Sequence, residues 1–137
     1  PGGNLGKQLK TVGDIMATGV RIPFISESKS MKEAIKTISK KKLGAVIVRN
    51  RNKMTTGIIT DGNVRKLRQK NIDFQKTLAK DVMTKNPITI TSDSLAIKAL
   101  RIMNEKKITS LCVINGKNSN KTTGLIHIHH ILESNIE

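Results

Sequence analysis

Hydrophobic positions in residues 31–38 follow the spacing of an amphipathic helix. Apolar side chains recur there at i, i+3, i+4 and i+7, which places them on one helical face. The members of this stripe are Met31, Ala34, Ile35 and Ile38. Ser30 precedes the stripe and Glu33 follows three positions later, so this pair predicts a capping box at the start of the helix.

A second stripe of the same kind occurs later in the chain. Its members are Leu95, Ala99, Ile102 and Met103. Ser94 stands directly before the stripe, where its hydroxyl is expected to cap the helix.

Each predicted helix lies between short strands. The extended pieces before the helices are 22–25 and 87–90, and the apolar strands after them are 45–48 and 111–114. A polar turn follows, and a further strand begins at Gly57 in one case and at Gly124 in the other. A last helix is expected to start near Asp61 and near His129.

The two sets of elements are copies of each other. GDIMATG (13–19) matches KDVMTKN (80–86), KKLGAVIV (41–48) matches KKITSLCV (106–113), and TTGIIT (55–60) matches TTGLIH (122–127). Matches that keep their order along a chain indicate an internal duplication. Each copy predicts the order β-α-β-β-α, an α/β (α+β) fold, with repeats at 12–71 and 79–137, a tail at 1–11 and a linker at 72–78.

Composition limits the class of protein. A chain of 137 residues suits one compact domain or a pair of very small ones. With two Phe, no Trp and no Tyr, the core is expected to be aliphatic. The single Cys excludes an intramolecular disulfide and fits a reducing compartment. No apolar run approaches the length of about 18 residues that a membrane span needs, so no membrane partner is expected.

The formal charge of +15 raises the question of a nucleic-acid partner. The lysines are spread over the whole chain, and the longest cationic run is Lys40-Lys41-Lys42. Proteins that bind single strands stack bases on aromatic side chains, and this chain has two. We therefore favour a solvated, lysine-rich surface without a nucleic-acid partner, and a basic nucleic-acid-binding protein is the alternative from another class.

The duplicated unit resembles a CBS-domain pair, also called a Bateman module. The resemblance covers residues 12–134 and implies two repeats related by a pseudo-two-fold axis. The nucleotide-binding signature of that family is G-h-h-[ST]-x-x-D, where h is apolar. The first copy has Thr60 at the Ser/Thr position and Asn63 in place of Asp, and the second has His127 and His130. Both copies depart at the position that contacts ribose, so AMP is expected to bind weakly or not at all.

The resemblance implies a ligand cleft between the repeats, with a helix N-terminus facing a phosphate. The candidate ligand-binding residues are Ile22, Pro23, Lys42, Gly44, Thr60, Asp61, Asn63, Arg65, Ile88, Thr109, His127, His129 and His130. No cofactor is certain, and a nucleotide or sugar nucleotide is the possible effector. The cations around the first copy favour an anionic small molecule.

The three histidines all lie in GLIHIHHILE (124–133). Imidazole is a common metal ligand, but no carboxylate or Cys follows at metal-ligand spacing. Cys112 lies on the preceding predicted strand, where a lone Cys is usually part of the core. Hydrogen bonding at the cleft is the favoured role and ligand contact is the second. No metal site is assigned.

Three segments give a more specific resemblance, to isomerases that interconvert ribulose 5-phosphate and arabinose 5-phosphate. In those enzymes a sugar isomerase (SIS) domain precedes a CBS pair. PGGNLGKQL (1–9) is similar to the end of their SIS domain, and TDGNVRK (60–66) and HIHHIL (127–132) are similar to segments of their repeats.

The resemblance implies a chain cut from such an isomerase, which would feed synthesis of Kdo for lipopolysaccharide in a Gram-negative cytoplasm. No nucleophile–base or acid–base pair stands out in this chain, and the resemblance places catalysis in the SIS domain. We expect a regulatory or assembly-forming module without enzymatic activity. It would form a homodimer, within a homotetrameric parent. A purely structural dimerisation module that binds no ligand is the alternative within the family.

Overall fold

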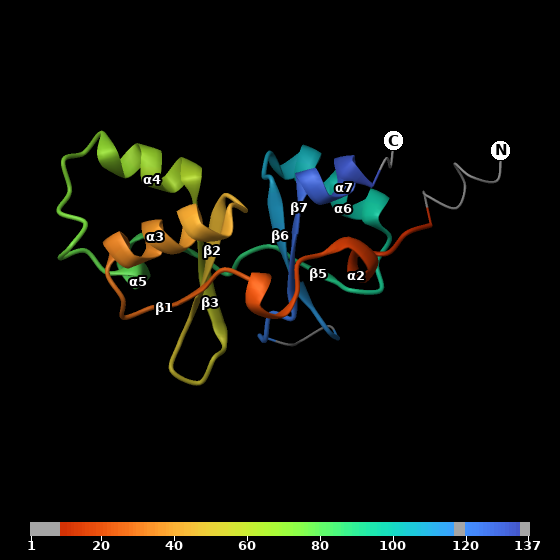
Figure 1. Ribbon diagram of the computed structural model, residues 1–137, viewed down its shortest axis with the longest axis horizontal. Helices are drawn as coiled ribbons and strands as arrows, with labels where there is room; N and C mark the ends of the chain where they lie inside the picture. The colour runs from red at the N-terminus through yellow and green to blue at the C-terminus, as the bar shows by residue number, and fades with distance from the viewer. Residues whose placement is uncertain (1–8, 117–119, 135–137) are drawn as a thin grey trace. The chain divides into compact units, whose positions relative to one another are not determined.

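The computed structural model describes residues 9–116 and 120–134. Within them the chain forms two compact units, whose elements are labelled in Figure 1. One unit is Val20–Pro87, and the other joins the described residues up to Gly19 to those from Ile88 onward. Each unit contains one small sheet with helices, so the α/β fold class predicted from the sequence is confirmed.

The unit Val20–Pro87 contains a four-stranded sheet with the strand order β1-β2-β3-β4. β1 runs parallel to β2, and the other neighbours are antiparallel. The strands are β1 (Phe24–Ser26), β2 (Ala45–Arg49), β3 (Thr55–Thr60) and β4 (Thr84–Lys85). The helices are α3 (Met31–Lys41), α4 (Asp61–Arg68) and α5 (Ala79–Val82), and the short 3-10 helix η1 (Gly19–Arg21) lies at the boundary.

The other unit contains a three-stranded sheet in the order β5-β6-β7. Its strands are β5 (Thr89–Thr91), β6 (Ser110–Ile114) and β7 (Gly124–His127). Its helices are α2 (Val12–Ile15), α6 (Ala96–Lys106) and α7 (Ile128–Glu133). The elements β1-α3-β2-β3-α4 and β5-α6-β6-β7-α7 confirm the order β-α-β-β-α that the sequence predicts for each copy.

The helices of the unit Val20–Pro87 pack on one face of its sheet. Val46 and Val48 alternate along β2 with Ala45 and Ile47, so the two pairs point to opposite faces. Val46 and Val48 belong to one buried cluster with residues from all three helices. The members of this cluster are Ile25, Met31, Ala34, Ile38, Val46, Val48, Ile59, Val64 and Ala79. The predicted helical stripe therefore faces the core, with Ile35 partly buried beside it.

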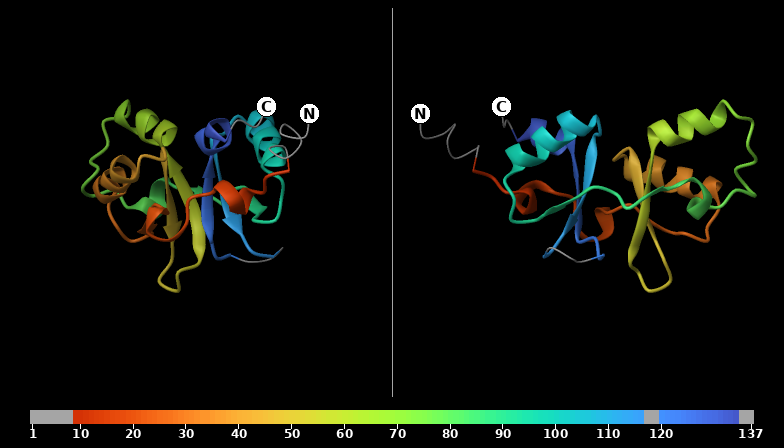
Figure 2. Two further views of the ribbon diagram at one scale, coloured as in Figure 1. Left: turned by 45° about the vertical axis from the view of Figure 1, so that its right-hand side comes forward. Right: turned by 180° about the vertical axis from the view of Figure 1, so that it is seen from behind.

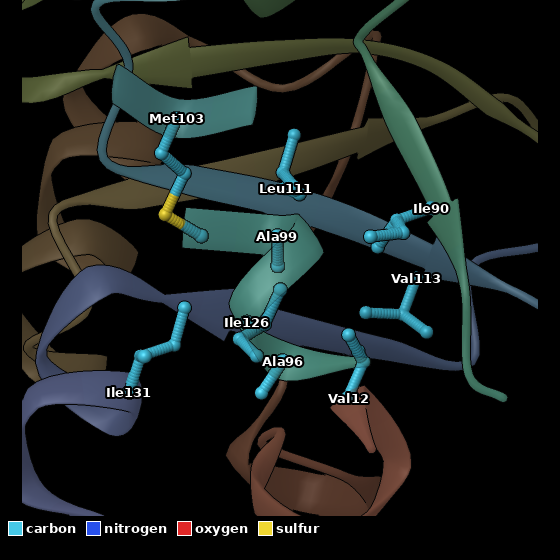
Figure 3. Close-up of a cluster of buried hydrophobic side chains, with 9 residues drawn as sticks. All are labelled: Val12, Ile90, Ala96, Ala99, Met103, Leu111, Val113, Ile126 and Ile131. Atoms are coloured by element: carbon cyan, nitrogen blue, oxygen red, sulfur yellow. The ribbon is translucent and has the colours of Figure 1, made fainter. Parts of the chain in front are cut away.

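Figure 3 shows the corresponding cluster of the other unit, built from α2, α6, α7 and all three strands. Its members are Val12, Ile90, Ala96, Ala99, Met103, Leu111, Val113, Ile126 and Ile131. The buried members of both clusters are aliphatic, as the composition predicts.

The strands before α3 and α6 begin later than the sequence patterns predict. Both predicted extended pieces, 22–25 and 87–90, contain a strand, but β1 starts only at Phe24 and β5 only at Thr89. Proline has no backbone N–H to donate to a ladder. Pro23 contributes only its carbonyl, which accepts from the amide of Ile47 at 2.7 Å.

The N-termini of α3 and α6 are held mainly by carbonyls from distant parts of the chain. The Met31 amide donates to Thr77 O, and the Ala96 amide donates to Lys10 O, both at 2.8 Å. Because a helix leaves its first amides without internal partners, these carbonyls take the place of side-chain caps. At α3, Ser30 Oγ also accepts from the Glu33 amide at 3.3 Å. Among the described residues no return bond from the Glu33 side chain completes the predicted capping box.

The predicted cap at Ser94 is wrong. Helix α6 begins at Ala96, and its N-cap residue is Leu95, which makes no side-chain hydrogen bond. The Ser94 hydroxyl is instead paired with the Thr91 hydroxyl at 2.8 Å. The Ser94 carbonyl accepts from the amide of Val12 at 2.8 Å, which ties this corner to α2.

GDIMATG and KDVMTKN share the pattern D-[IV]-M, at residues 14–16 and 81–83. These D-[IV]-M segments pack on the sheet of the other sequence copy. Helix α2, from the first copy, contacts β7, and Ala17 and Leu125 exchange two backbone hydrogen bonds of 2.9 and 3.1 Å. Helix α5, from the second copy, contacts α3 and β3, and β4 pairs with β3. The two further views in Figure 2 show α2 in the unit that contains β7. Each compact unit therefore combines pieces of both sequence copies.

A methionine from each of these segments lies directly on a strand glycine. A Cβ built on Gly57 would lie 2.6 Å from the sulfur of Met83, closer than Cβ atoms approach other heavy atoms. A Cβ built on Gly124 would be still closer to the sulfur of Met16. Only glycine leaves room for the two thioethers, so the shared G of TTGIIT and TTGLIH has a packing reason.

We expect Gly57→Ala and Gly124→Ala each to lower the free energy of unfolding by about 1–3 kcal/mol, because the added methyl group overpacks the methionine contact. Urea unfolding measures the change. The cost of Gly57→Ala should shrink when Met83 is shortened to Ala, since the clash partner is then gone.

Gly62→Ala is the matched control for these substitutions. Its Cβ would meet only Thr60 Oγ1, at an ordinary 3.7 Å. Since alanine is the better residue inside a helix, this change should be neutral or stabilise by up to about 1 kcal/mol. Equal losses at Gly62 and Gly57 would contradict the methionine–glycine contact as the cause.

Candidate functional site

The signature of the first copy forms a capping box at the start of α4. The Asn63 amide donates to Thr60 Oγ1 at 3.3 Å, and the Thr60 amide donates to Asn63 Oδ1 at 2.9 Å. The Thr60 hydroxyl also lies 3.1 Å from Asn63 Oδ1 as a donor. The acceptor oxygen of Asn63 is therefore already used within the chain, and its side chain can offer a ligand only the two N–H groups of Nδ2.

The signature of the second copy forms the same box with imidazoles. The His129 amide donates to His127 Nδ1, and the His127 amide donates to His130 Nδ1, both at 3.0 Å. The rings of His127 and His129 are also close, with centroids 4.6 Å apart. Each capping nitrogen is committed to a backbone amide, which leaves Nε2 of His127 and His130 facing away from the cap as a donor.

Four candidate residues line one pocket of about 600 Å³ between α3 and α4. They are Lys42, Gly44, Asp61 and Arg65, and the remaining lining residues are Ile35, Ile38, Ser39, Val64 and Arg68. Asp61 is the first residue of α4, as predicted, and its amide donates to Gly44 O at 3.0 Å. The lining thus contains three cations and one carboxylate beside three aliphatic side chains, so the pocket has an excess of positive charge.

The equivalent surface of the other unit is different. The Ile128 amide donates to Thr109 O at 2.8 Å, which repeats the Asp61–Gly44 bond. Ile128 and Leu132, however, occupy the positions that Asp61 and Arg65 hold in the first copy. Leu132 is 53% exposed. Two charged positions of the first pocket are therefore apolar in the second copy.

A second pocket of about 510 Å³ lies beside α4 and α5. Asn63 lines it together with Lys66, Leu67, Ile72, Thr77, Asp81 and Val82. Sequence reasoning missed two lining residues, Arg68 in the first pocket and Asp81 in the second. The available signal for Asp81 was its counterpart Asp14 in the other D-[IV]-M segment, because a repeated segment of this kind packs on a sheet.

The remaining candidates lie outside both pockets. Ile22 and Pro23 are buried, whereas Ile88 and Thr109 are exposed. Ile88, Thr109 and the three histidines belong to the unit that begins at Ile88, and the other candidates belong to Val20–Pro87. Within each unit, therefore, the structure brings together Lys42, Gly44, Asp61 and Arg65 in one group and the histidines in another.

Cys112 is fully buried on β6, as expected for a core residue. Burial raises the pKa of its thiol to about 12, and a hydrogen bond from Thr122 offsets this only partly. A thiol that stays protonated is neither a nucleophile nor a metal ligand. Across residues 9–116 and 120–134, no group of three or more His, Cys, Asp or Glu side chains is arranged to hold a metal ion.

None of the helices in the described part of the chain is long and apolar enough to cross a membrane.

The CBS-domain family model matches residues 12–70 and 79–137. The chain therefore belongs to the CBS-domain family, with two copies of the domain.

Among curated proteins, the arabinose 5-phosphate isomerase KdsD of Escherichia coli K12 is 34% identical over 137 residues, covering 99% of this chain and 41% of KdsD. The uncharacterised protein RP505 of Rickettsia prowazekii is 38% identical over 138 residues, with the same coverage. The chain thus spans about two fifths of the length of these relatives. A crystal structure of CBSX2 in complex with AMP superposes with a TM-score of 0.75 at 22% identity, covering 92% of this chain and 96% of that one.

We expect the Cys112 thiol of the folded protein to react with Ellman's reagent at pH 8 about a thousandfold more slowly than the thiol of the unfolded chain. A pKa raised from 9.0 to about 12 lowers the thiolate fraction by that order. Rapid stoichiometric reaction of the native protein would contradict the buried, protonated state.

The raised pKa of Cys112 also makes the free energy of unfolding depend on pH. The folded state keeps the thiol protonated while the unfolded chain ionises above its ordinary pKa of 9.0, so this contribution falls as the pH rises above that value. Cys112→Ala serves as the control, because it removes the ionisable group from both states.

Proposed function

We propose that the chain is the CBS module of an isomerase that interconverts ribulose 5-phosphate and arabinose 5-phosphate, and that the module regulates or assembles the parent enzyme. The observation that carries this proposal is the similarity to KdsD, which extends over 99% of the chain. Because the match leaves more than half of KdsD outside, the catalytic SIS domain would lie in the rest of the parent protein. The parent would then act in Kdo and lipopolysaccharide synthesis in the cytoplasm.

The purified chain is expected to show no turnover of arabinose 5-phosphate. Its CBS copies provide caps and core packing, and the buried thiol of Cys112 is held protonated. A coupled assay for ribulose 5-phosphate tests this at micromolar protein. Turnover that rises in proportion to the concentration of the purified chain would overturn the assignment to a non-catalytic module.

The proposed effector is anionic. Lys42, Arg65 and Arg68 border the pocket between α3 and α4 against a single carboxylate, and the formal charge of the chain is +15. A nucleotide or sugar nucleotide from the pathway of the parent enzyme fits this charge. CBSX2, a protein with the same fold, has been crystallised with AMP.

AMP itself is a poor fit to the two signatures. A carboxylate at the position of Asn63 or His130 would cap the helix with one oxygen and keep the other for ribose hydroxyls. Asn63 Oδ1 and His130 Nδ1 are already occupied by the amides of Thr60 and His127. Both side chains then present donors where the family signature presents a charged acceptor.

We expect native protein to bind AMP weakly or not at all, and Asn63→Asp with His130→Asp to strengthen binding by roughly tenfold per site, because a charge-assisted hydrogen bond is stronger than a neutral one. Isothermal calorimetry on both proteins measures this. Tight AMP binding by the native chain that the double change does not improve would show that the reasoning about ribose is wrong.

The proposal includes a homodimer of the module within a homotetrameric parent. Exposed apolar side chains on the helices, such as Leu132 on α7, give a face for a second copy. Light scattering that finds only monomer at high micromolar concentration would argue against it. A module that joins subunits without binding any ligand would show this dimer and no response to nucleotides or sugar phosphates.

A further inference from the structure

The cap of helix α7 depends on two unprotonated imidazole nitrogens. A backbone N–H can only donate, so the atom that faces it must be an acceptor. His127 Nδ1 faces the His129 amide, and His130 Nδ1 faces the His127 amide. Both rings must therefore be neutral and carry their proton on Nε2, because a protonated Nδ1 has no lone pair to accept with.

The equivalent helix of the other unit has the same cap without a titratable group. Thr60 and Asn63 hold the start of α4 through the same pair of backbone contacts. Neither side chain changes its charge between pH 4 and 9. The two caps thus share their geometry but differ in their sensitivity to protonation.

Protonation of the imidazoles would act against α7 in two ways. The added proton turns Nδ1 into a donor that points at another donor, so each capping bond is lost. The added charge lies at the positive end of the helix dipole, which favours anions and disfavours cations. Both effects destabilise α7.

The charged groups near the cap add to this destabilisation of α7 by protonation. On α7 itself, the exposed His129 lies beside His127, and Glu133 lies at the far end. Helix α6, which packs on α7, brings Lys98, Arg101 and Lys106 against one acid, Glu105. On β7, which also contacts α7, His127 is the one titratable residue. Cations therefore outnumber acids on these neighbouring elements.

Loss of the cap would reach the core of the unit. Helix α7 is only 6 residues long, so it depends strongly on its first turn. Its Ile131 is fully buried in the aliphatic cluster shown in Figure 3. Release of α7 would expose this residue and weaken its packing on α6.

We propose that α7 is a pH-responsive element, held by neutral His127 and His130 and released when they are protonated, while α4 is insensitive to the same change. The folded state favours the neutral rings, so the stabilisation is complete above about pH 6.5, where free imidazole titrates, and is lost as the pH falls below it. This response is independent of the parent enzyme and of any ligand.

Amide hydrogen exchange of the whole chain at pH 7.5 and 5.5 tests the proposal, after correction for the intrinsic exchange rates. Protection in Ile128–Glu133 should fall by about tenfold or more at the lower pH, and protection in Asp61–Arg68 should stay constant. A loss that is equal in both helices, or no loss in α7, would overturn it.

Three variants sharpen the test. His127→Thr with His130→Asn installs the cap of the other unit and should abolish the pH response of α7. Thr60→His with Asn63→His should transfer the response to α4. His129→Gln is the matched control, because its backbone amide still donates and its side chain takes no part in the cap, so the response should remain. A response that persists in the first variant contradicts the proposal.

A measurement on the native protein does not depend on the folding of any variant. Nitrogen chemical shifts of the imidazoles at pH 7.5 report the tautomer directly. The proposal requires the Nε2–H form for both His127 and His130. The Nδ1–H form at either ring would overturn it.

Discussion

Contact between a methionine and a bare strand glycine docks one of the repeated D-[IV]-M segments on the sheet of each unit. Met83 lies on Gly57 and Met16 lies on Gly124, and the chain positions of the two pairs correspond in the duplication. The contact fixes where the D-[IV]-M segment meets the strand. The strand then continues for three residues to Thr60 or His127, the N-cap of the following helix. The position of each candidate signature thus follows from a close approach that no other residue type permits.

The two copies share this framework and differ in the chemistry placed on it. In the first copy, Asp61 and Arg65 make the surface beside α4 polar and charged, whereas Ile128 and Leu132 make the equivalent surface of α7 apolar. The caps differ in the same way, with a neutral hydroxyl and amide in one copy and imidazoles in the other. The contacts that build the fold are thus alike in both copies, whereas the residues on this surface differ in charge and polarity.

Periodicity was sufficient to predict the element order, because the helical stripes and the apolar strands leave clear patterns in the sequence. It could not predict which D-[IV]-M segment packs on which sheet, because the two segments have similar sequences and either one would suit either sheet. The cap at Ser94 failed for a related reason: the Ala96 amide is satisfied by the distant carbonyl of Lys10, which no local pattern reveals. The signature residues were identified from the resemblance as ligand contacts. Their role as caps follows from the same spacing, which also defines a capping box.

The placement of α2 has a consequence for the order in which the chain folds during synthesis. The unit Val20–Pro87 is continuous in sequence, so all of its partners are present once Pro87 has left the ribosome. Ala17 instead pairs with Leu125, which is made much later. At ordinary rates of translation this interval is on the order of ten seconds. For that time the segment with Val12 and Met16 must wait without its sheet, while all partners of the unit Val20–Pro87 are already present.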